Sequence, residues 1–394
     1  MDLREIQKEI KENGLDGWLF YDFANRDPIS YRILGLDEKD HTSRRWYYFI
    51  PREGEPEKLI SSVEPGKLES LPGIKHYYHK WEEHHEFLKG MLKGCSKLAM
   101  NYSPNNHIPY VSMIDLGTGE LIRSFGVEIV SAMDLIQIFE GLVKEDAFQT
   151  HTEIMPVMHD IIDGAFNKIG ESLRLNRKIT EYDIQCWMLE KFEDNNLVRL
   201  GMSPSVAVNG NAALPHFNPA LSTAEIQKDD LILIDSWAKK NITDAVCYDV
   251  TWMGYSGSMI PTRIQEIWET VRDARDLVIS VEKEKFAQQE TCFGWELDRV
   301  ARDFIEKKGF GKYFRHRTGH SIGRDVHGDA VHLDNFEIKD DRRLVPYILH
   351  SVEPGIYIPE ENIGIRSEVD VYIDGNGEVS VTGPLQKEIV RIEC

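Results

Sequence analysis

Cysteine is scarce in this sequence and follows no motif. Five cysteines occur in 394 residues, an odd number, and no Cys-x-x-Cys pair is present. This usage argues against a disulfide framework and against a thiolate zinc site. The five positions are Cys95, Cys186, Cys247, Cys292 and Cys394.

Long apolar runs and an excess of basic residues are also missing. No apolar run is long enough to span a bilayer, and the charged start MDLREIQKEI has no apolar signal core, so we expect a cytoplasmic protein. Lysine and arginine number 46 against 66 acidic residues, which gives a net charge of −20. This balance argues against nucleic acid and anionic membrane surfaces as partners.

A widespread class of phosphate-binding motif is absent as well. The sequence contains no glycine-rich phosphate loop of the form GxGxxG or GxxxxGK[ST]. It does have the means to fold into large cores, because 41% of its residues are hydrophobic and 10% are aromatic. Its length is enough for two domains or one large domain.

The order of helical and strand-like segments predicts two domains. Helices alternate with strands up to about residue 140, beginning with a helix over 2–14 and a strand over 17–23, so we expect an α/β domain over 1–145. It shows no dense cluster of catalytic side chains, which favours a structural, capping or dimer-forming role.

A long helix begins the second predicted domain, 146–394, with Pro156 expected in the first turn of that helix. Residues 180–197 and 294–310 each start with E-x-D and continue as an amphipathic helix. This repeated pattern favours an α+β domain built from two related halves.

The stretch TGHSIGRDVHG places His320 and His327 seven residues apart among glycines. Gly319 and Gly323 argue against a helix, and an odd spacing in a flat strand would send the two rings to opposite faces. We therefore expect a strand end followed by a glycine-permitted bend that returns both rings to one cavity. Alternatively, one histidine is a core residue and the other is exposed.

Acidic residues occur at four strand-like positions of the second domain. Asp235 ends the run LILID, and Asp249 lies in YDVTW, so the two are expected on a β-hairpin. Glu353 precedes Pro-Gly, and Glu368 is expected within a later strand, with Arg366 on the same face to orient or neutralise it. Buried carboxylates of this kind repel one another unless cations pair with them. Four carboxylates and one imidazole suit two divalent ions that share bridging ligands.

The ordered motifs D…D-[IV]-T…GH-x-x-G-x-x-x-H…E-P-G-x-Y…G-x-R-x-E resemble the pita-bread metallopeptidases (M24), which include methionine aminopeptidase, aminopeptidase P and prolidase. The match covers roughly residues 150–394, and VAVNGNAALPHFNP adds His216. The N-terminal part resembles the added domain of aminopeptidase P, prolidase and creatinase, with DPISYRILGL as a faint signature.

The resemblance implies a fold, an activity and a set of residue roles. It implies a pita-bread catalytic domain that hydrolyses the N-terminal bond of short peptides with proline at the second position, in a chain expected to form a homodimer. The implied cofactors are two divalent ions, Mn²⁺ or Co²⁺ in assays with Zn²⁺ as an alternative. The implied metal ligands are Asp235, Asp249, His320, Glu353 and Glu368. Glu353 also moves the proton, His327 stabilises the oxyanion, and His216, His327 and Arg366 contact the substrate.

The chain departs from the family pattern in ways that leave the substrate preference open. Thirteen residues separate the two aspartates, more than is usual, and Asp244 is a rival ligand within them. Trp252 stands where arginine is common, Gly328 where an acid is common, and Arg317 where glycine is usual. The other readings are a metal-free hydrolase similar to creatinase and a non-catalytic binding module on the same fold. The intact set of ligand motifs argues against both.

Overall fold

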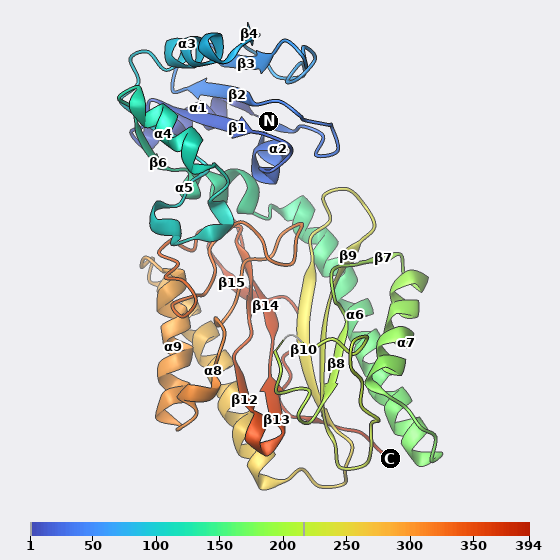
Figure 1. Cartoon of the computed structure of the whole chain (residues 1–394). Helices are drawn as coiled ribbons and strands as arrows, with labels where there is room; N and C mark the ends of the chain where they lie inside the picture. Colours follow the sequence, from blue (N-terminus) through green and yellow to red (C-terminus); the bar gives the residue numbers. More distant parts are fainter. Residues whose placement is uncertain (1, 216) are drawn as a thin grey trace. The chain divides into compact units, whose positions relative to one another are not determined.

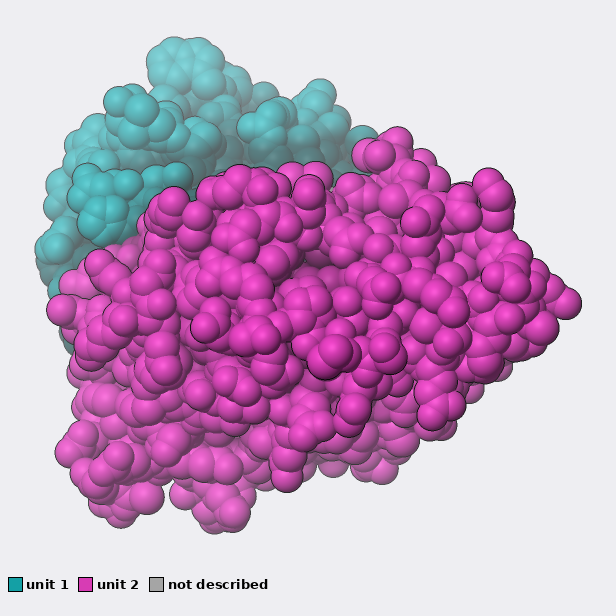
Figure 2. Space-filling view, turned by 90° about the horizontal axis from the view of Figure 1, so that it is seen from below, with its two compact units in different colours: residues 1–140 teal, residues 141–394 magenta. Residues whose placement is uncertain are grey.

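The computed structural model describes residues 2–215 and 217–394. The chain divides into two compact units, Met1–Glu140 and Gly141–Cys394, which Figure 2 shows in different colours. The boundary predicted from the sequence, between residues 145 and 146, falls in the first turn of helix α6 (Glu145–Arg174). Each unit has its own sheets and its own hydrophobic core.

A six-stranded mixed sheet forms the centre of the N-terminal unit, in the order β4-β3-β2-β1-β5-β6 (Figure 1). Its strands are β1 Gly17–Asp22, β2 Trp46–Pro51, β3 Glu57–Ser61, β4 Ile74–Tyr78, β5 Lys97–Met100 and β6 Glu128–Ser131. Its α-helices are α1 Leu3–Glu12, α2 Pro28–Leu34, α3 Trp81–Met91, α4 Leu116–Ser124 and α5 Met133–Ile136. Short 3₁₀ turns cover Pro104–Asn106 and Pro109–Val111, and a π-helical turn covers Gln137–Gly141. The α/β alternation predicted for this part is confirmed.

Helix α1 and strand β1 show how the sequence builds this unit. The Asp2 carboxylate accepts hydrogen bonds from the N–H groups of Arg4 and Glu5, which satisfies donors that the first helical turn leaves free. Ile6 and Ile10, one turn apart, form the buried stripe of the helix. Strand β1 pairs with β2 on one side and β5 on the other, so all of its residues are buried. A continuous apolar run suits that central position.

His84 of α3 is a buried base without a hydrogen-bond partner among the described residues. Its ring lies 5.3 Å from the Tyr47 ring and 5.0 Å from the Tyr78 ring, centroid to centroid. Burial, and then the charges of Arg45 and His85, lower the pKa of His84 to about 3. The folded N-terminal unit therefore holds this imidazole neutral.

We expect acid to destabilise the N-terminal unit through His84. An unfolded histidine titrates near pH 6.5, so between about pH 6.5 and 3 the unfolded chain binds a proton that the folded chain cannot. Stability should fall by roughly 1 kcal/mol per pH unit in this window. Urea unfolding at pH 7 and pH 5 measures the effect. His84→Phe should lose less stability than the wild type over this interval, and an equal loss would show that His84 is not responsible.

The C-terminal unit places its strands between two pairs of helices (Figure 1). Helices α6 and α7 (Glu181–Asp194) lie on one side, and α8 (Thr262–Ala287) and α9 (Gly294–Lys307) on the other. One sheet has the order β16-β10-β9-β7, with β8 also paired to β9, and the smaller sheets are β11-β14-β15 and β12-β13. The strands are β7 Leu197–Arg199, β8 Ser205–Val208, β9 Leu231–Lys240, β10 Tyr248–Tyr255, β11 Leu349–Val352, β12 Gly355–Ile358, β13 Ile363–Arg366, β14 Val369–Ile373, β15 Val379–Val381 and β16 Val390–Arg391. Short 3₁₀ turns cover Gly311–Tyr313 and Pro359–Glu361. The predicted α+β architecture is confirmed.

Two apolar clusters hold these layers together. One lies between α6, α7 and one face of the β9–β10 sheet, with Ile162, Phe166 and Met188 among its fully or nearly fully buried members. The other joins α8 and α9 to the smaller sheets, and the fully buried Trp268 belongs to it. The functional side chains described below project from strands whose opposite faces and ends are fixed in these clusters.

The predicted position of Pro156 is wrong. Helix α6 begins at Glu145, so Pro156 lies in its interior and not in its first turn. An interior proline removes one backbone hydrogen bond and costs about 3 kcal/mol in an isolated helix. Tertiary packing outweighs this cost, because α6 buries a long apolar face that includes Ile154, Met158 and Ile162.

Candidate functional site

Strands β9 and β10 place the two aspartates of the predicted hairpin on one face. The strands pair antiparallel, with Asp235 opposite Thr251 and Asp249 opposite Trp237. Asp249 is two residues from Thr251, so the two carboxylates are diagonal neighbours on the same side of the sheet. The rival residue Asp244 lies in the exposed connection and forms an ion pair with Arg324, at 3.0 Å.

Trp252 does not approach this face. It follows Thr251 on β10, so its side chain projects from the opposite side of the strand. Its ring lies 5.3 Å from that of His159 on helix α6. The tryptophan that replaces a common arginine of the family therefore packs on α6.

The bend after Gly319 brings the two histidine rings together, as the sequence predicted. Gly319 and Ser321 form isolated bridges to Leu333 and His350, and the chain then bends through residues 323–327. The His320 and His327 ring centroids lie 4.4 Å apart, edge to face. His320 is buried, whereas His327 is exposed.

The orientation of His320 turns one nitrogen towards carboxylates. Its Nδ1–H donates to the Ser321 carbonyl oxygen at 3.1 Å, so Nε2 carries the lone pair. Nε2 lies 3.5 Å from Asp249 Oδ2 and 3.4 Å from Glu353 Oε1. Burial, and then the neighbouring His327, hold the pKa of His320 well below its usual value. A neutral imidazole fixed in this way is suited to bind a metal ion.

Gly319 is needed because the chain passes close to strand β11. A Cβ atom on Gly319 would lie 2.0 Å from the Ser351 carbonyl oxygen, whereas a Cβ atom on Gly323 would meet nothing within 4 Å. We expect Gly319→Ala to destabilise the C-terminal unit by about 1–3 kcal/mol or more and to displace His320. Gly323→Ala, in the same bend, is the matched control and should behave as wild type. Denaturant unfolding of both variants checks this, and equal stabilities would show that the contact does not constrain the bend.

The two glutamates come from strand ends. Glu353 directly follows β11, and its N–H donates to the Thr318 carbonyl oxygen at 2.7 Å. The sequence placed Glu368 within a strand, and this prediction is wrong: Glu368 lies in the short link between β13 and β14. Here the chain passes from the β12–β13 sheet to the β11–β14–β15 sheet. The sequence reads as one continuous strand-like run, so it does not show this break between two strands.

Three of the predicted ligands form a compact group. One ligand atom from each of Asp249, His320 and Glu368 lies within 4.8 Å of the other two, and all three residues are buried. Glu353 joins this group through its contact with His320. Asp235 is linked to it by Arg366, whose guanidinium donates to Asp235 Oδ2.

Arg366 connects several parts of the site. Its Nε donates to Thr251 Oγ1 at 3.0 Å, and the Thr251 hydroxyl donates to Glu368 Oε2 at 2.6 Å. Another guanidinium nitrogen donates to the Tyr357 hydroxyl oxygen at 3.0 Å. Arg366 is buried, and these bonds go to protein groups, so it orients Asp235 directly and Glu368 through Thr251. Its expected contact with substrate stays a prediction.

The buried carboxylates of this group are crowded, so a bound cation would stabilise their charged forms. Burial, and then the charges of neighbouring carboxylates, raise the pKa of Asp249 and Glu368 well above their usual values. Burial also raises the pKa of Glu353 to about 7, although Arg366 and Arg317 oppose the shift. Asp249 Oδ1 is buried and has no hydrogen-bond partner among the described residues. Divalent ions would satisfy both the crowded charge and this oxygen, so the residues present fit a metal centre.

Three residues that contact the predicted ligands or Arg366 were not predicted from the sequence, and one predicted site residue is not described by the structure. His216 lies outside the described residues. Thr251 and Tyr357 lie within the motifs D-[IV]-T and E-P-G-x-Y, which predict no role for them. Asp370 belongs to none of the motifs, although its spacing of two from Glu368 in a strand-like run was a usable signal.

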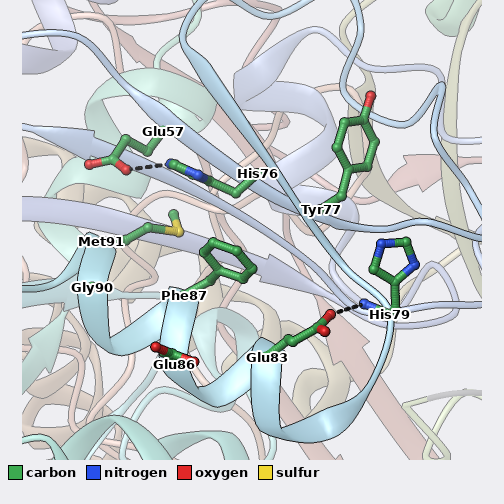
Figure 3. Close-up of a pocket in the computed structure, with 9 residues that line it drawn as sticks. All are labelled: Glu57, His76, Tyr77, His79, Glu83, Glu86, Phe87, Gly90 and Met91. Carbon is green, nitrogen blue, oxygen red and sulfur yellow. Dashed lines mark hydrogen bonds and ion pairs between the residues drawn. The ribbon is translucent and has the colours of Figure 1, made fainter.

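The N-terminal unit has a groove of its own, between strand β4 and helix α3 (Figure 3). It has a volume of about 610 Å³. Two polar pairs lie along it: Glu57 Oε2 is 2.8 Å from His76 Nε2, and Glu83 accepts a hydrogen bond from the His79 N–H. Among the described residues, the group able to hold a metal ion is the one in the C-terminal unit.

None of the helices within residues 2–215 and 217–394 has both the length and the apolar character required to cross a bilayer.

Known proteins similar to this chain are metallopeptidases and dipeptidases, which is consistent with a metal-binding group in the C-terminal unit. The model of metallopeptidase family M24 matches residues 153–375. The Xaa-Pro dipeptidase of Pyrococcus furiosus is 26% identical, and the alignment covers 96% of this chain and 97% of that protein.

Solved structures match along the whole chain. The dipeptidase PepE of Mycobacterium ulcerans superposes with a TM-score of 0.74 at 18% identity, over 99% of this chain and 96% of that one. The prolidase of Pyrococcus horikoshii OT3 has a TM-score of 0.64 at 20% identity, over 98% and 99% of the two chains. Because the family match spans more than half of the sequence and these folds cover nearly all of it, the chain belongs to metallopeptidase family M24, with the pita-bread fold, and is a metallopeptidase.

Proposed function

We propose that this metallopeptidase hydrolyses the N-terminal peptide bond of short peptides that carry proline at the second position, with two divalent ions bound. The observation that supports this most is the buried group of Asp249, His320 and Glu368, which Glu353 and Asp235 extend. A relative named Xaa-Pro dipeptidase aligns along nearly the whole chain, which supports proline-containing substrates.

The five side chains that would hold the ions are Asp235, Asp249, His320, Glu353 and Glu368. Four carboxylates and one imidazole favour Mn²⁺ or Co²⁺, with Zn²⁺ as an alternative. When bound in such a site, a pair of divalent ions polarises the scissile carbonyl group and lowers the pKa of a water molecule towards neutrality.

The remaining chemistry belongs to residues of the chain itself. Glu353, whose Oε1 lies 3.4 Å from His320 Nε2, is the carboxylate that we assign to accept and return the proton. His327 is exposed beside His320 and supplies a hydrogen bond to the developing oxyanion. Arg366 and Thr251 keep Asp235 and Glu368 in place. For His216, which lies outside the described residues, the role we propose is the one its motif implies, a contact with the scissile amide or the leaving group.

The test is a comparison of matched peptides. The purified chain, loaded with Mn²⁺ or Co²⁺, is assayed on an Xaa-Pro dipeptide, the matching Xaa-Ala dipeptide and an Xaa-Pro tripeptide. We expect metal-dependent hydrolysis of the proline peptides and little hydrolysis of Xaa-Ala. Equal rates on Xaa-Ala would contradict the preference for proline. Hydrolysis in the presence of a chelator, with no bound metal, would favour the metal-free, creatinase-like alternative. A complete lack of hydrolysis would favour the non-catalytic binding module.

A further inference from the structure

Asp370 lies directly behind the predicted metal ligand Asp249. It is a buried residue of strand β14, two residues after Glu368. Its Oδ2 accepts a hydrogen bond from the Asp249 N–H at 2.8 Å. Its Oδ1 has no hydrogen-bond partner among the described residues, so the contact with Asp249 is the main polar role of this side chain.

The Asp249 backbone needs such a partner because of its place in the sheet. Strand β10 pairs with β9 along its whole length on one side, but β16 reaches it on the other side only at Gly254 and Tyr255. At Asp249, which is buried, no strand of the described residues pairs with that second edge of β10, and the neighbouring strand β14 reaches it through the Asp370 side chain. A buried N–H group without an acceptor is unfavourable, and the Asp370 carboxylate takes the place of the missing strand.

Asp370 is itself held by several elements. It pairs with Ser351 in the β11–β14 ladder, and its carbonyl oxygen accepts a hydrogen bond from the Thr382 N–H at 2.9 Å. His151 of α6 lies 3.9 Å from its carboxylate; His151 Nδ1–H donates to the Cys247 carbonyl oxygen, and Nε2 pairs with the Thr382 hydroxyl. Contacts with β11, Thr382 and His151 therefore restrict the position of the Asp370 carboxylate.

We propose that Asp370 is a positioning residue for the metal centre: by fixing the Asp249 backbone, it sets the direction in which the Asp249 carboxylate points. The β11–β14 ladder extends this effect, because Ser351, the partner of Asp370, accepts a hydrogen bond from the His320 N–H at 3.0 Å. Asp370 thus helps to hold two of the predicted ligands. The inference rests on the proposed metal centre.

Calorimetric titration of the metal-free full-length protein with Mn²⁺ tests this proposal. Asp370→Ala removes the acceptor, Asp370→Leu removes it while filling the space, and Asp370→Asn keeps an oxygen acceptor at the same distance. Loss of a group that orients a metal ligand weakens metal binding by about 10–100-fold, so we expect this loss in the Ala and Leu variants. The Asn variant should keep most of the wild-type affinity. If Asp370→Ala does not fold, the Leu and Asn variants make the same comparison.

The outcomes separate this inference from the proposed function. Ala and Leu variants that bind Mn²⁺ as tightly as the wild type would overturn the positioning role, even if their thermal stability falls. An Asn variant that binds Mn²⁺ as weakly as the Ala variant would overturn it too, because an oxygen acceptor at this position would then not maintain metal affinity. If the wild-type protein binds no Mn²⁺, Co²⁺ or Zn²⁺, it is the proposed metal centre that fails. Hydrogen exchange at the Asp249 amide in the metal-free protein should be faster in the Ala and Leu variants than in the Asn variant.

Discussion

Replacing Asp249 by asparagine is expected to abolish hydrolysis of an Xaa-Pro peptide while the fold persists. Asp249 is buried at the centre of the ligand group, 3.5 Å from His320 Nε2, and its Oδ1 has no protein partner among the described residues. Asparagine has nearly the same shape but offers one neutral oxygen where the carboxylate offers two charged ones. We expect kcat/KM to fall by about 10³-fold or more, equivalent to about 4 kcal/mol in the barrier.

Asp244→Asn is the matched control for this experiment. Asp244 was the rival ligand in the same inter-strand segment, but it is exposed and pairs with Arg324. The control should retain the activity and metal content of the wild type, and circular dichroism should show both variants folded. Wild-type turnover in Asp249→Asn, or loss of turnover in Asp244→Asn, would show that the ligand has been assigned to the wrong aspartate.

The two histidines of the bend should separate catalysis from metal binding. His320 is buried with Nε2 towards Asp249 and Glu353, whereas His327 is exposed beside it. His327→Ala removes the proposed oxyanion donor, and the loss of such a donor lowers kcat by about 10²–10³-fold. Its metal content should stay near that of the wild type. His320→Ala should lose metal as well as activity.

Bound metal and hydrolysis of an Xaa-Pro peptide are measured together on both variants. If His327→Ala loses its metal while His320→Ala keeps it, the two roles are reversed. If both variants keep full activity, the histidines are structural. The paired design distinguishes these outcomes because both rings occupy the same bend, with centroids 4.4 Å apart.

The features of the fold and site that are predictable from the sequence are those in which local pattern and chemistry coincide. The apolar run ending in Asp235 and the strand around Asp249 form the predicted hairpin, because strand pairing follows from alternation and a short polar connection. The bend that joins His320 to His327 was predictable from its glycines, since few other residues fit where Gly319 passes β11. The α/β and α+β character of the two units followed from the order of their elements.

The misplaced features depend on contacts between distant segments. Local propensity disfavours proline inside a helix and so predicts Pro156 in a first turn, but burial of the α6 face outweighs that cost. Glu368 was placed in a strand because nothing local marks where the chain passes from one small sheet to the next. Thr251 and Asp370 matter through partners more than 100 residues away, which no local pattern reports.

The most direct test of the proposed dinuclear centre is a titration of the metal-free protein with Mn²⁺, in which bound metal and hydrolysis of an Xaa-Pro dipeptide are measured on the same samples. Four carboxylates and one imidazole are the ligand set for a pair of ions. We predict that hydrolysis rises with bound metal and reaches its plateau at about two ions per chain. Full hydrolysis in samples that contain no bound metal would contradict the account.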